Sequence, residues 1–165
     1  MFSFGIDTDT YEFDSGITVD DIARYFITHN TGPFFSMFEV GFDGYRFDLF
    51  RINPHTQYIR IFEFKSCRRD FISDKKWQNY LKYCHTFSFV CPREAIKKTD
   101  LAKGIGLLWI HKWRYKERLK GCDDWAFDKQ WIQKPCRKEL DKDMLLKIAF
   151  MVAQRALWRP RDIFR

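Results

Sequence analysis

The chain has 165 residues, of which 45% are hydrophobic, so it can form one domain with a sizeable core but not two comfortable ones. A net charge of +7 and a pI near 9.2 favour an anionic partner such as nucleic acid, although basic surfaces can also be simply solvated. The opening residues do not resemble a secretory signal, and no segment approaches the ~18 apolar residues of a membrane helix. We therefore expect a cytoplasmic protein with no membrane partner.

The cysteines and histidines lack the spacing of a metal site. The five cysteines are an odd number without a CxxC pair, which argues against a disulfide framework and a compact zinc site. The histidines, at 29, 55, 85 and 111, are expected in surface or hydrogen-bonded core roles. Buried free thiols are the main expectation, and the alternative is a cluster of Cys84, Cys91, Cys122 and Cys136.

The first predicted element is a helix in the stretch ITVDDIARYFITHN. Thr18 precedes Asp20 and Asp21, and acids suit the first turn of a helix. The apolar stripe expected to face the core consists of Ile22, Tyr25 and Phe26.

Three strands are predicted next, joined by two hairpins. Asp43-Gly44 indicates a two-residue type I′ turn, which pairs Phe42 with Tyr45 and Glu39 with Asp48. Centring the following loop between His55 and Thr56 pairs Asp48 with Glu63. This register predicts one apolar face made of Phe38, Val40, Phe47, Leu49, Phe62 and Phe64.

The opposite face of these strands gathers Glu39, Asp48, Glu63 and Lys65. Neighbouring carboxylates repel one another unless a cation lies between them. Hard oxygen ligands of this kind suit Mg²⁺ or Mn²⁺. The alternative is that Arg46 and Lys65 form salt bridges with these acids on a solvated sheet face.

A helix capped by Asp70 or Ser73 is predicted to run to about Tyr83. Its apolar face carries Trp77, Tyr80, Leu81 and Cys84, which we interpret as core. Candidate contacts to a DNA backbone in this region are Arg68, Arg69, Lys75, Lys76, Gln78 and Lys82. Exposed basic side chains on a helix can also be simply solvated.

The stretch HKWRYKERLKG predicts a strand with a basic face. The cations on that face are Lys112, Arg114, Lys116, Arg118 and Lys120. A nucleic-acid backbone would neutralise them with counterion release, whereas an edge strand kept soluble by lysines is an equal alternative.

Helical spacing of Leu140, Met144, Ile148, Met151 and Val152 predicts a helix over 138–158, ending before Pro160. We expect this helix to cover the sheet or to form the face of a homodimer. No repeat or Gly/Ser linker indicates a second domain.

An acid followed across a hairpin by Glu-x-Lys, here Asp48 and Glu63-Phe64-Lys65, resembles the PD-(D/E)XK nuclease superfamily. The longer stretch FEFKSCRRDFISDKKWQNYLKYC is similar to the MmcB-like family of candidate DNA repair nucleases, whose pattern is E-x-K-S-x-x-x-D-F-x-x-D-x-K-W-x-x-Y-x-x-Y-C. The likeness covers about residues 37–110, including FSFVCP and GIGLLWI, and fades outside that span. His85 stands where the family commonly shows Asp.

The resemblance implies an α/β (α+β) fold with a restriction-endonuclease-like αβββαβ core, a mixed sheet flanked by helices. One domain would span 1–165, with the core at about 17–110 and an extra strand and the C-terminal helix at about 111–160. Asp48, Glu63 and the Phe64 carbonyl would bind Mg²⁺ or Mn²⁺, and Lys65 would orient the attacking water. From register alone, Glu39 could bind a second metal, hold a water of the first or balance Arg46.

These observations predict a metal-dependent nuclease that hydrolyses phosphodiester bonds in DNA, in preference to RNA, during repair or DNA processing. The alternative is a DNA-binding or repair-adaptor module on the same fold without catalysis.

Overall fold

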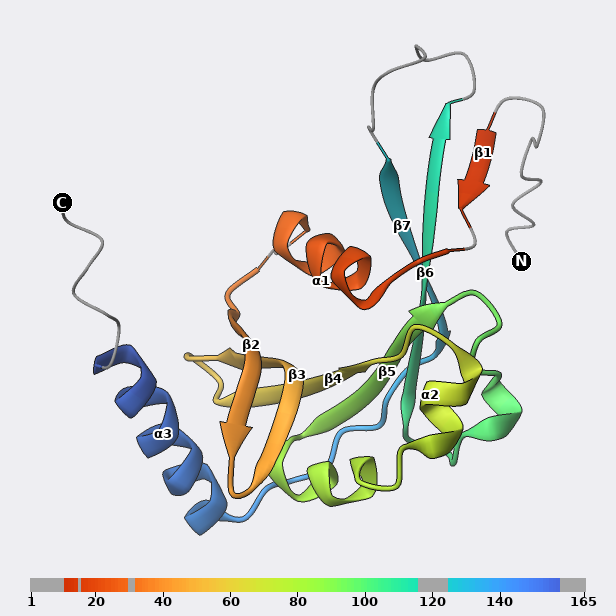
Figure 1. Cartoon of the computed structure of the whole chain (residues 1–165). Coiled ribbons are helices and arrows are strands. Elements are labelled where there is room, and N and C mark those ends of the chain that lie inside the picture. Colours follow the sequence, from red (N-terminus) through yellow and green to blue (C-terminus); the bar gives the residue numbers. More distant parts are fainter. Residues whose placement is uncertain (1–10, 15, 30–31, 116–124, 158–165) are drawn as a thin grey trace, which may run out of the picture.

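The computed structural model describes residues 11–14, 16–29, 32–115 and 125–157 (Figure 1). Within these ranges the elements are β1 (Tyr11–Asp14), α1 (Val19–Thr28), β2 (Phe35–Phe42), β3 (Tyr45–Asn53), β4 (Tyr58–Phe64), α2 (Arg68–Ser73), the 3₁₀ helix η1 (Trp77–Tyr83), β5 (Thr86–Pro92), the 3₁₀ helix η2 (Lys98–Asp100), β6 (Gly106–Tyr115), β7 (Ala126–Gln133) and α3 (Lys142–Leu157).

The strands form one mixed sheet with the order β1-β6-β5-β4-β3-β2, and β7 pairs with β6. The ladders from β2 to β4 are antiparallel, whereas β4, β5 and β6 run parallel. Helices lie on both sides of the sheet, as Figure 1 shows for α1 and α2. The prediction of a mixed α+β fold with a C-terminal helix is therefore confirmed. None of the helices in the described ranges has the length and apolar character needed to cross a membrane.

Helix α1 forms as its sequence predicts. The Thr18 hydroxyl accepts a hydrogen bond from the Asp21 N–H at 3.1 Å, and the Asp21 carboxylate accepts one from the Thr18 N–H at 3.0 Å. This capping box satisfies two amides at the helix start. The predicted stripe is buried and packs on β3 and β4 in a core that includes Ile22, Tyr25, Phe26, Leu49, Phe62 and Phe64.

The predicted strand register is confirmed for the residues that pair in the two hairpins. Asp43 and Gly44 have φ values of 51° and 78°, as a type I′ turn requires. Phe42 pairs with Tyr45, and across the next hairpin Leu49 pairs with Phe62. The predicted pairs Glu39–Asp48 and Asp48–Glu63 are not among the ladder pairs, and the β3–β4 ladder ends at Leu49 and Phe62.

The predicted single apolar face is wrong for the outer half of the first hairpin. Val40 and Phe47 lie in the core on the opposite side of the sheet from Leu49. Glu39, with φ of 52°, leaves the extended conformation between Phe38 and Val40. Strict alternation of side chains is lost at that point, because alternation requires extended backbone.

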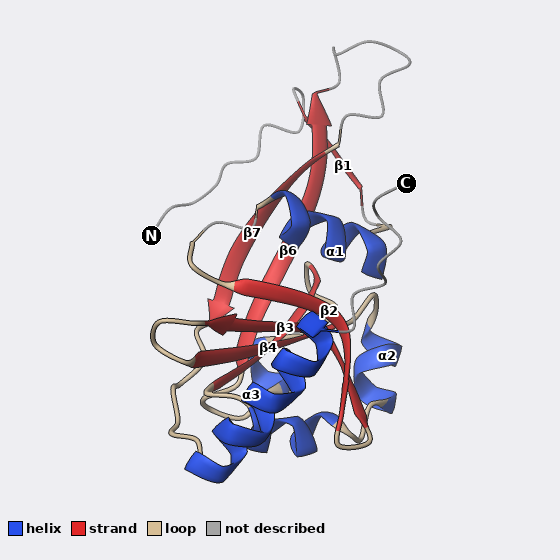
Figure 2. Cartoon of the chain, turned by 90° about the vertical axis from the view of Figure 1, so that its left-hand side faces the viewer, coloured by secondary structure: helices blue, strands red, loops and turns tan. Residues whose placement is uncertain are grey.

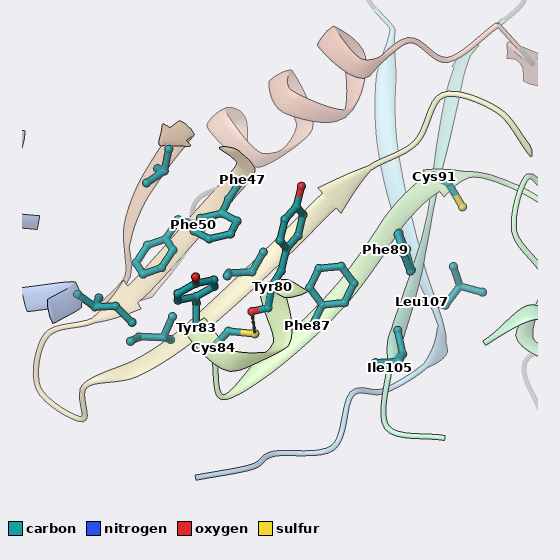
Figure 3. Packing of buried hydrophobic residues seen from close by; sticks show 14 of the residues in the cluster. Phe47, Phe50, Tyr80, Tyr83, Cys84, Phe87, Phe89, Cys91, Ile105 and Leu107 are labelled. Carbon is teal, nitrogen blue, oxygen red and sulfur yellow. Dashed lines mark hydrogen bonds between the residues drawn. The ribbon is translucent and has the colours of Figure 1, made fainter. Parts of the chain in front are cut away.

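The second core packs η1 and α3 against the other face of the sheet (Figure 3). Aromatic rings dominate it: Phe47 lies 5.1 Å from Tyr80 and 5.6 Å from Tyr83 between ring centroids. Trp77 stacks on Phe87 at 5.6 Å. The interpretation of Trp77 and Tyr80 as packing residues therefore agrees with the structure.

The predicted helix to Tyr83 is instead two short helices, α2 and η1, separated at residues 74–76. The Asp74 carboxylate accepts hydrogen bonds from the N–H groups of Lys76 and Trp77, at 2.8 and 3.3 Å. A side chain that bonds the backbone two and three residues ahead competes with the helical hydrogen bonds. The break follows from that local bond.

The predicted basic strand is the second half of β6, which is longer than expected. Residues 106–115 form one strand, with β5 and β1 along one edge and β7 along the other. The alternative of an exposed edge strand is therefore wrong for the described part of this segment. Lys116, Arg118 and Lys120 lie outside the described residues.

Helix α3 begins at Lys142, four residues later than predicted, and lies beside the β2–β3 hairpin (Figure 2). The preceding segment stays extended because Cys136 and Lys138 donate backbone hydrogen bonds to Gly104 and His85. Ile148 and Met151 are buried against the sheet. The helix thus covers the sheet, as one of the two predicted roles required.

Candidate active site

The acid and base of the Glu-x-Lys motif lie at the carboxyl end of β4. Glu63 pairs with Phe89 of β5, and the Lys65 N–H donates to the Val90 carbonyl at 2.9 Å. Glu63 and Lys65 are 6% and 7% exposed, so the alternative of a solvated sheet face is wrong at these two residues. Both side chains start from backbone held in the middle of the sheet.

Asp48 reaches the same place from β3. Its Oδ2 accepts a hydrogen bond from the Phe64 N–H at 2.7 Å, just past the last paired residues, Leu49 and Phe62. The carboxylate thus accepts a hydrogen bond from a backbone N–H that lies beyond the end of the ladder. This bond fixes Asp48 beside the Glu-x-Lys motif.

Lys65 bridges two carboxylates. Its Nζ donates to Glu63 Oε1 at 2.9 Å and to Asp74 Oδ2 at 2.6 Å. Asp74 comes from the break between α2 and η1, so a third chain segment joins the two strands. The expected salt bridge of Lys65 is present, but it is buried rather than solvated.

Three carboxyl groups, those of Asp48, Glu63 and Asp74, lie near the single ammonium of Lys65, which contacts Glu63 and Asp74. Burial and, second, the Asp48 charge raise the pKa of Glu63 to about 8 against the opposing effect of Lys65. Burial also raises the pKa of Asp48, although the Phe64 N–H and Lys65 favour its ionised form. Desolvation and like charge thus both act against full ionisation of the pair.

Tyr80 adds a hydroxyl to the site. Burial raises the pKa of Tyr80, and the charges of Glu63, Asp74 and Asp48 raise it further. Figure 3 shows its ring standing beside Phe47 and Phe87. Neither Asp74 nor Tyr80 was predicted as a site residue, because Tyr80 matched the apolar stripe and Asp74 matched the helix.

The donor atoms fit a hard divalent cation. Glu63 Oε2 is buried and has no hydrogen-bond partner among the described residues. Buried carboxylate oxygens are normally paired with a donor or a metal. Across the described ranges, no group of three or more His, Cys, Asp or Glu side chains is arranged to hold a metal. A cation here would therefore depend on Asp48 and Glu63, with the Phe64 carbonyl and waters, as suits Mg²⁺.

Glu39 lies at the rim of the site. It forms a 2.8 Å ion pair with Arg46, with both side chains more than half exposed. Its charge raises the pKa of Asp48 slightly, so it is near that carboxylate. Of the roles considered for Glu39, balancing Arg46 is the one that this contact supports.

The predicted DNA contacts after β4 fall into two kinds. Arg68 is held by two hydrogen bonds to Asp100, at 2.6 and 2.9 Å, which join α2 to η2. Lys82 lies 3.7 Å from Asp43. The remaining candidates on this segment are exposed: Arg69, Lys75, Lys76 and Gln78.

Lys112 and Arg114 pair with acids of the same chain. Lys112 Nζ lies 3.0 Å from Asp14 and 3.2 Å from Asp21, and Arg114 Nε lies 2.7 Å from Glu12. The carboxylates of β1 and α1 therefore offset the charge that a nucleic acid was expected to neutralise.

The cysteine expectation agrees with the described residues. Cys84 and Cys91 are buried free thiols, and burial raises the pKa of each to about 12. Cys136 is exposed, and Cys122 lies outside the described residues. His85 is buried, and its Nδ1 accepts the Ile59 N–H at 3.0 Å, a hydrogen-bonded core role.

Comparison with known proteins finds a structure of similar fold and does not indicate an activity. Neither a known protein family nor a curated protein matches the chain. Among solved structures, the SPO1766 protein of unknown function from Silicibacter pomeroyi is similar, with 27% identity, a TM-score of 0.56 and coverage of 87% of this chain and 92% of that one. The resemblance to PD-(D/E)XK nucleases therefore stays a prediction.

Proposed function

We propose that the protein is a metal-dependent nuclease that hydrolyses phosphodiester bonds in DNA, with Asp48, Glu63 and Lys65 as its reactive centre. The observation that carries the proposal is the incompletely paired, buried Glu63: its Oε1 shares the Lys65 ammonium with Asp74, its Oε2 has no partner among the described residues, and the nearby Asp48 charge disfavours its ionised form. A divalent cation would remove both costs at once.

The order helix, three antiparallel strands, helix and parallel strand supports the further proposal of a restriction-endonuclease-like core. In that core Asp48 and Glu63 would lie just beyond the end of the β3–β4 ladder. The Glu-x-Lys motif lies at the same end of β4, and this links the proposed fold to the proposed chemistry.

Each side chain has a role that its contacts support. Asp48 and Glu63, with the Phe64 carbonyl, would hold Mg²⁺ or Mn²⁺. When bound, such an ion lowers the pKa of its water and offsets charge that develops on phosphate oxygens. Lys65 has two of its three N–H donors on carboxylates, which leaves one to orient a water or a phosphate oxygen.

A DNA-binding or repair-adaptor module without catalysis is the second candidate. The ion pairs of Lys65 with Glu63 and Asp74 favour this candidate, because a lysine that is bonded to two carboxylates has less freedom to contact a substrate. The exposed residues Arg69, Lys75 and Lys76 would serve either function.

The deciding experiment incubates nicked, branched, single-stranded and duplex DNA with Mg²⁺ or Mn²⁺. Wild type is compared with Glu63→Gln, Lys65→Ala and the control Glu139→Gln, which changes an exposed acid paired with Arg137. Cleavage by wild type and the control, lost in both site variants, supports the nuclease. Salt-sensitive binding without cleavage supports the module.

A further inference from the structure

We infer that Asp74 is the positioning residue of this site, holding the Lys65 ammonium group in place from outside the two strands that carry the acid pair. The catalytic meaning of this role rests on the proposed function. The contact itself does not, because it joins two side chains of the chain directly.

Asp74 gives Lys65 an anchor that is independent of Glu63. Lys65 Nζ donates to Asp74 Oδ2 at 2.6 Å and to Glu63 Oε1 at 2.9 Å. If Glu63 turned to bind a cation, its hold on Lys65 would weaken, whereas the Asp74 bond would remain. A charge-assisted hydrogen bond in a site this buried restricts a flexible lysine strongly.

Asp74 is itself fixed by its second oxygen. Oδ1 accepts the N–H groups of Lys76 and Trp77, at 2.8 and 3.3 Å. The Trp77 ring packs on Phe87 and Phe89, at centroid distances of 5.6 and 5.3 Å. Asp74 therefore connects the Lys65 ammonium to a backbone segment that is fixed by the packing of Trp77, and this restricts the position of the ammonium.

The same carboxylate links the site to a basic surface. Lys75 and Lys76, both exposed, belong to the short turn that Asp74 closes. A phosphodiester strand bound by these lysines would lie beside the residue that aims Lys65. Asp74 thus joins the proposed substrate-binding segment to the reactive centre.

The test compares Asp74→Asn with wild type in the absence of metal. Asparagine keeps an oxygen for the two backbone amides and loses the charge that faces Lys65. The control is Asp70→Asn, which removes a charge from the same segment at a residue that accepts a hydrogen bond from Ser66. The readout is the ¹H–¹⁵N signal of the Lys65 ammonium, assigned with Lys65→Arg.

We expect water exchange of the Lys65 ammonium protons to be at least about tenfold faster in Asp74→Asn and unchanged in Asp70→Asn. An unaltered Lys65 signal in Asp74→Asn would overturn the inference, whether or not the protein cuts DNA. Should Asp74→Asn fail to fold by tryptophan fluorescence, Asp74→Glu replaces it: it keeps the charge but displaces the anchoring oxygen, so the Lys65 ammonium protons should still exchange faster than in wild type.

With DNA, Asp74→Asn should lower kcat roughly 100-fold and leave KM unchanged, and Asp74→Glu should recover part of kcat. A loss confined to KM would contradict the positioning role. Absence of cleavage by wild type would refute the proposed function, while the ammonium signal would still decide whether Asp74 anchors Lys65.

Discussion

Glu63 is an acid kept almost entirely from water beside another acid, so its protonation and the stability of the protein are linked. Its pKa is about 8 in the folded chain and 4.5 in the unfolded chain. Between these values the folded state holds a proton that the unfolded state has lost. The contribution of neutral Glu63 to the free energy of unfolding is therefore fully present below pH 4.5. It is lost as the pH rises from 4.5 to 8, and above pH 8 it does not change further.

Glu63→Gln should remove this dependence in the metal-free protein. The variant's stability relative to wild type should grow by up to about 1.4 kcal/mol per pH unit between pH 5 and 8. Urea unfolding at four pH values measures the difference, with Glu139→Gln expected to follow wild type. Parallel pH profiles for wild type and Glu63→Gln would show that Glu63 is ionised throughout.

Gly106 of β6 pairs with Ser88 of the parallel strand β5 and lies close against it. A Cβ at this position would lie 2.1 Å from Ser88 Oγ and 2.7 Å from Ser88 Cβ. Gly106→Ala should therefore destabilise the protein by about 1–3 kcal/mol, because buried Ser88 must move. The control is Gly41→Ala in β2, where nothing lies within 4 Å of the added carbon. Equal thermal stability of the two variants would contradict this packing.

At the scale of elements, local signals made the central hairpins predictable. Asp43-Gly44 requires positive φ at both positions, and that requirement set the pairing that brings Asp48 to Glu63. Residues whose conformation depends on distant partners were not predictable. Strand β1 forms by pairing with β6, far away in the sequence, and it was not predicted. Strand β7, the next strand after β6, was not predicted either.

The acid pair of the site was predictable because the hairpin register brings Asp48 to the end of the β3–β4 ladder beside the Glu-x-Lys motif, whereas Asp74 was not. Its position depends on the Lys65 ammonium and on two backbone amides, and these contacts override the helical pattern around it. The change of face at Glu39 was missed for a similar reason, because the strand pattern contains no glycine there to indicate a positive φ.

Glu39 should carry backbone strain in the β2–β3 hairpin. Its φ of 52° is unfavourable for a residue with a side chain, so Glu39→Gly should be more stable than Glu39→Ala by about 1 kcal/mol. Both variants lose the Arg46 ion pair, so their difference isolates the conformation. Chemical denaturation provides the measurement, and an alanine variant as stable as the glycine variant would show that φ is not left-handed there.

For the whole molecule, several of the basic side chains that the sequence predicts as nucleic-acid contacts form ion pairs with acids of the same chain. Lys112 and Arg114 are paired with acids of β1 and α1, and Arg68 with Asp100. Lys75 and Lys76 are exposed cations that directly follow Asp74, the residue that bonds Lys65. The proposed DNA path therefore follows α2 and the turn after it, rather than β6.

The double variant Lys75→Gln/Lys76→Gln should weaken DNA binding and reduce its salt dependence. Each lost phosphate contact lowers the slope of log K against log salt by about 0.9 for duplex DNA, so a reduction approaching about 1.8 is expected. Fluorescence anisotropy at several salt concentrations measures the slope. The control Lys142→Gln/Lys147→Gln changes two exposed lysines of α3. An equal reduction in both double variants would indicate non-specific charge attraction.

Calorimetric titration of Mn²⁺ into wild type, Asp48→Asn and Glu63→Gln tests the central claim, that the buried acid pair binds a divalent cation, most directly. We predict saturable binding of Mn²⁺ at one site in wild type and in the control Glu139→Gln. Asp48→Asn and Glu63→Gln should each abolish this binding. Absence of binding by wild type, or binding that persists in both variants, would contradict the proposed metal centre.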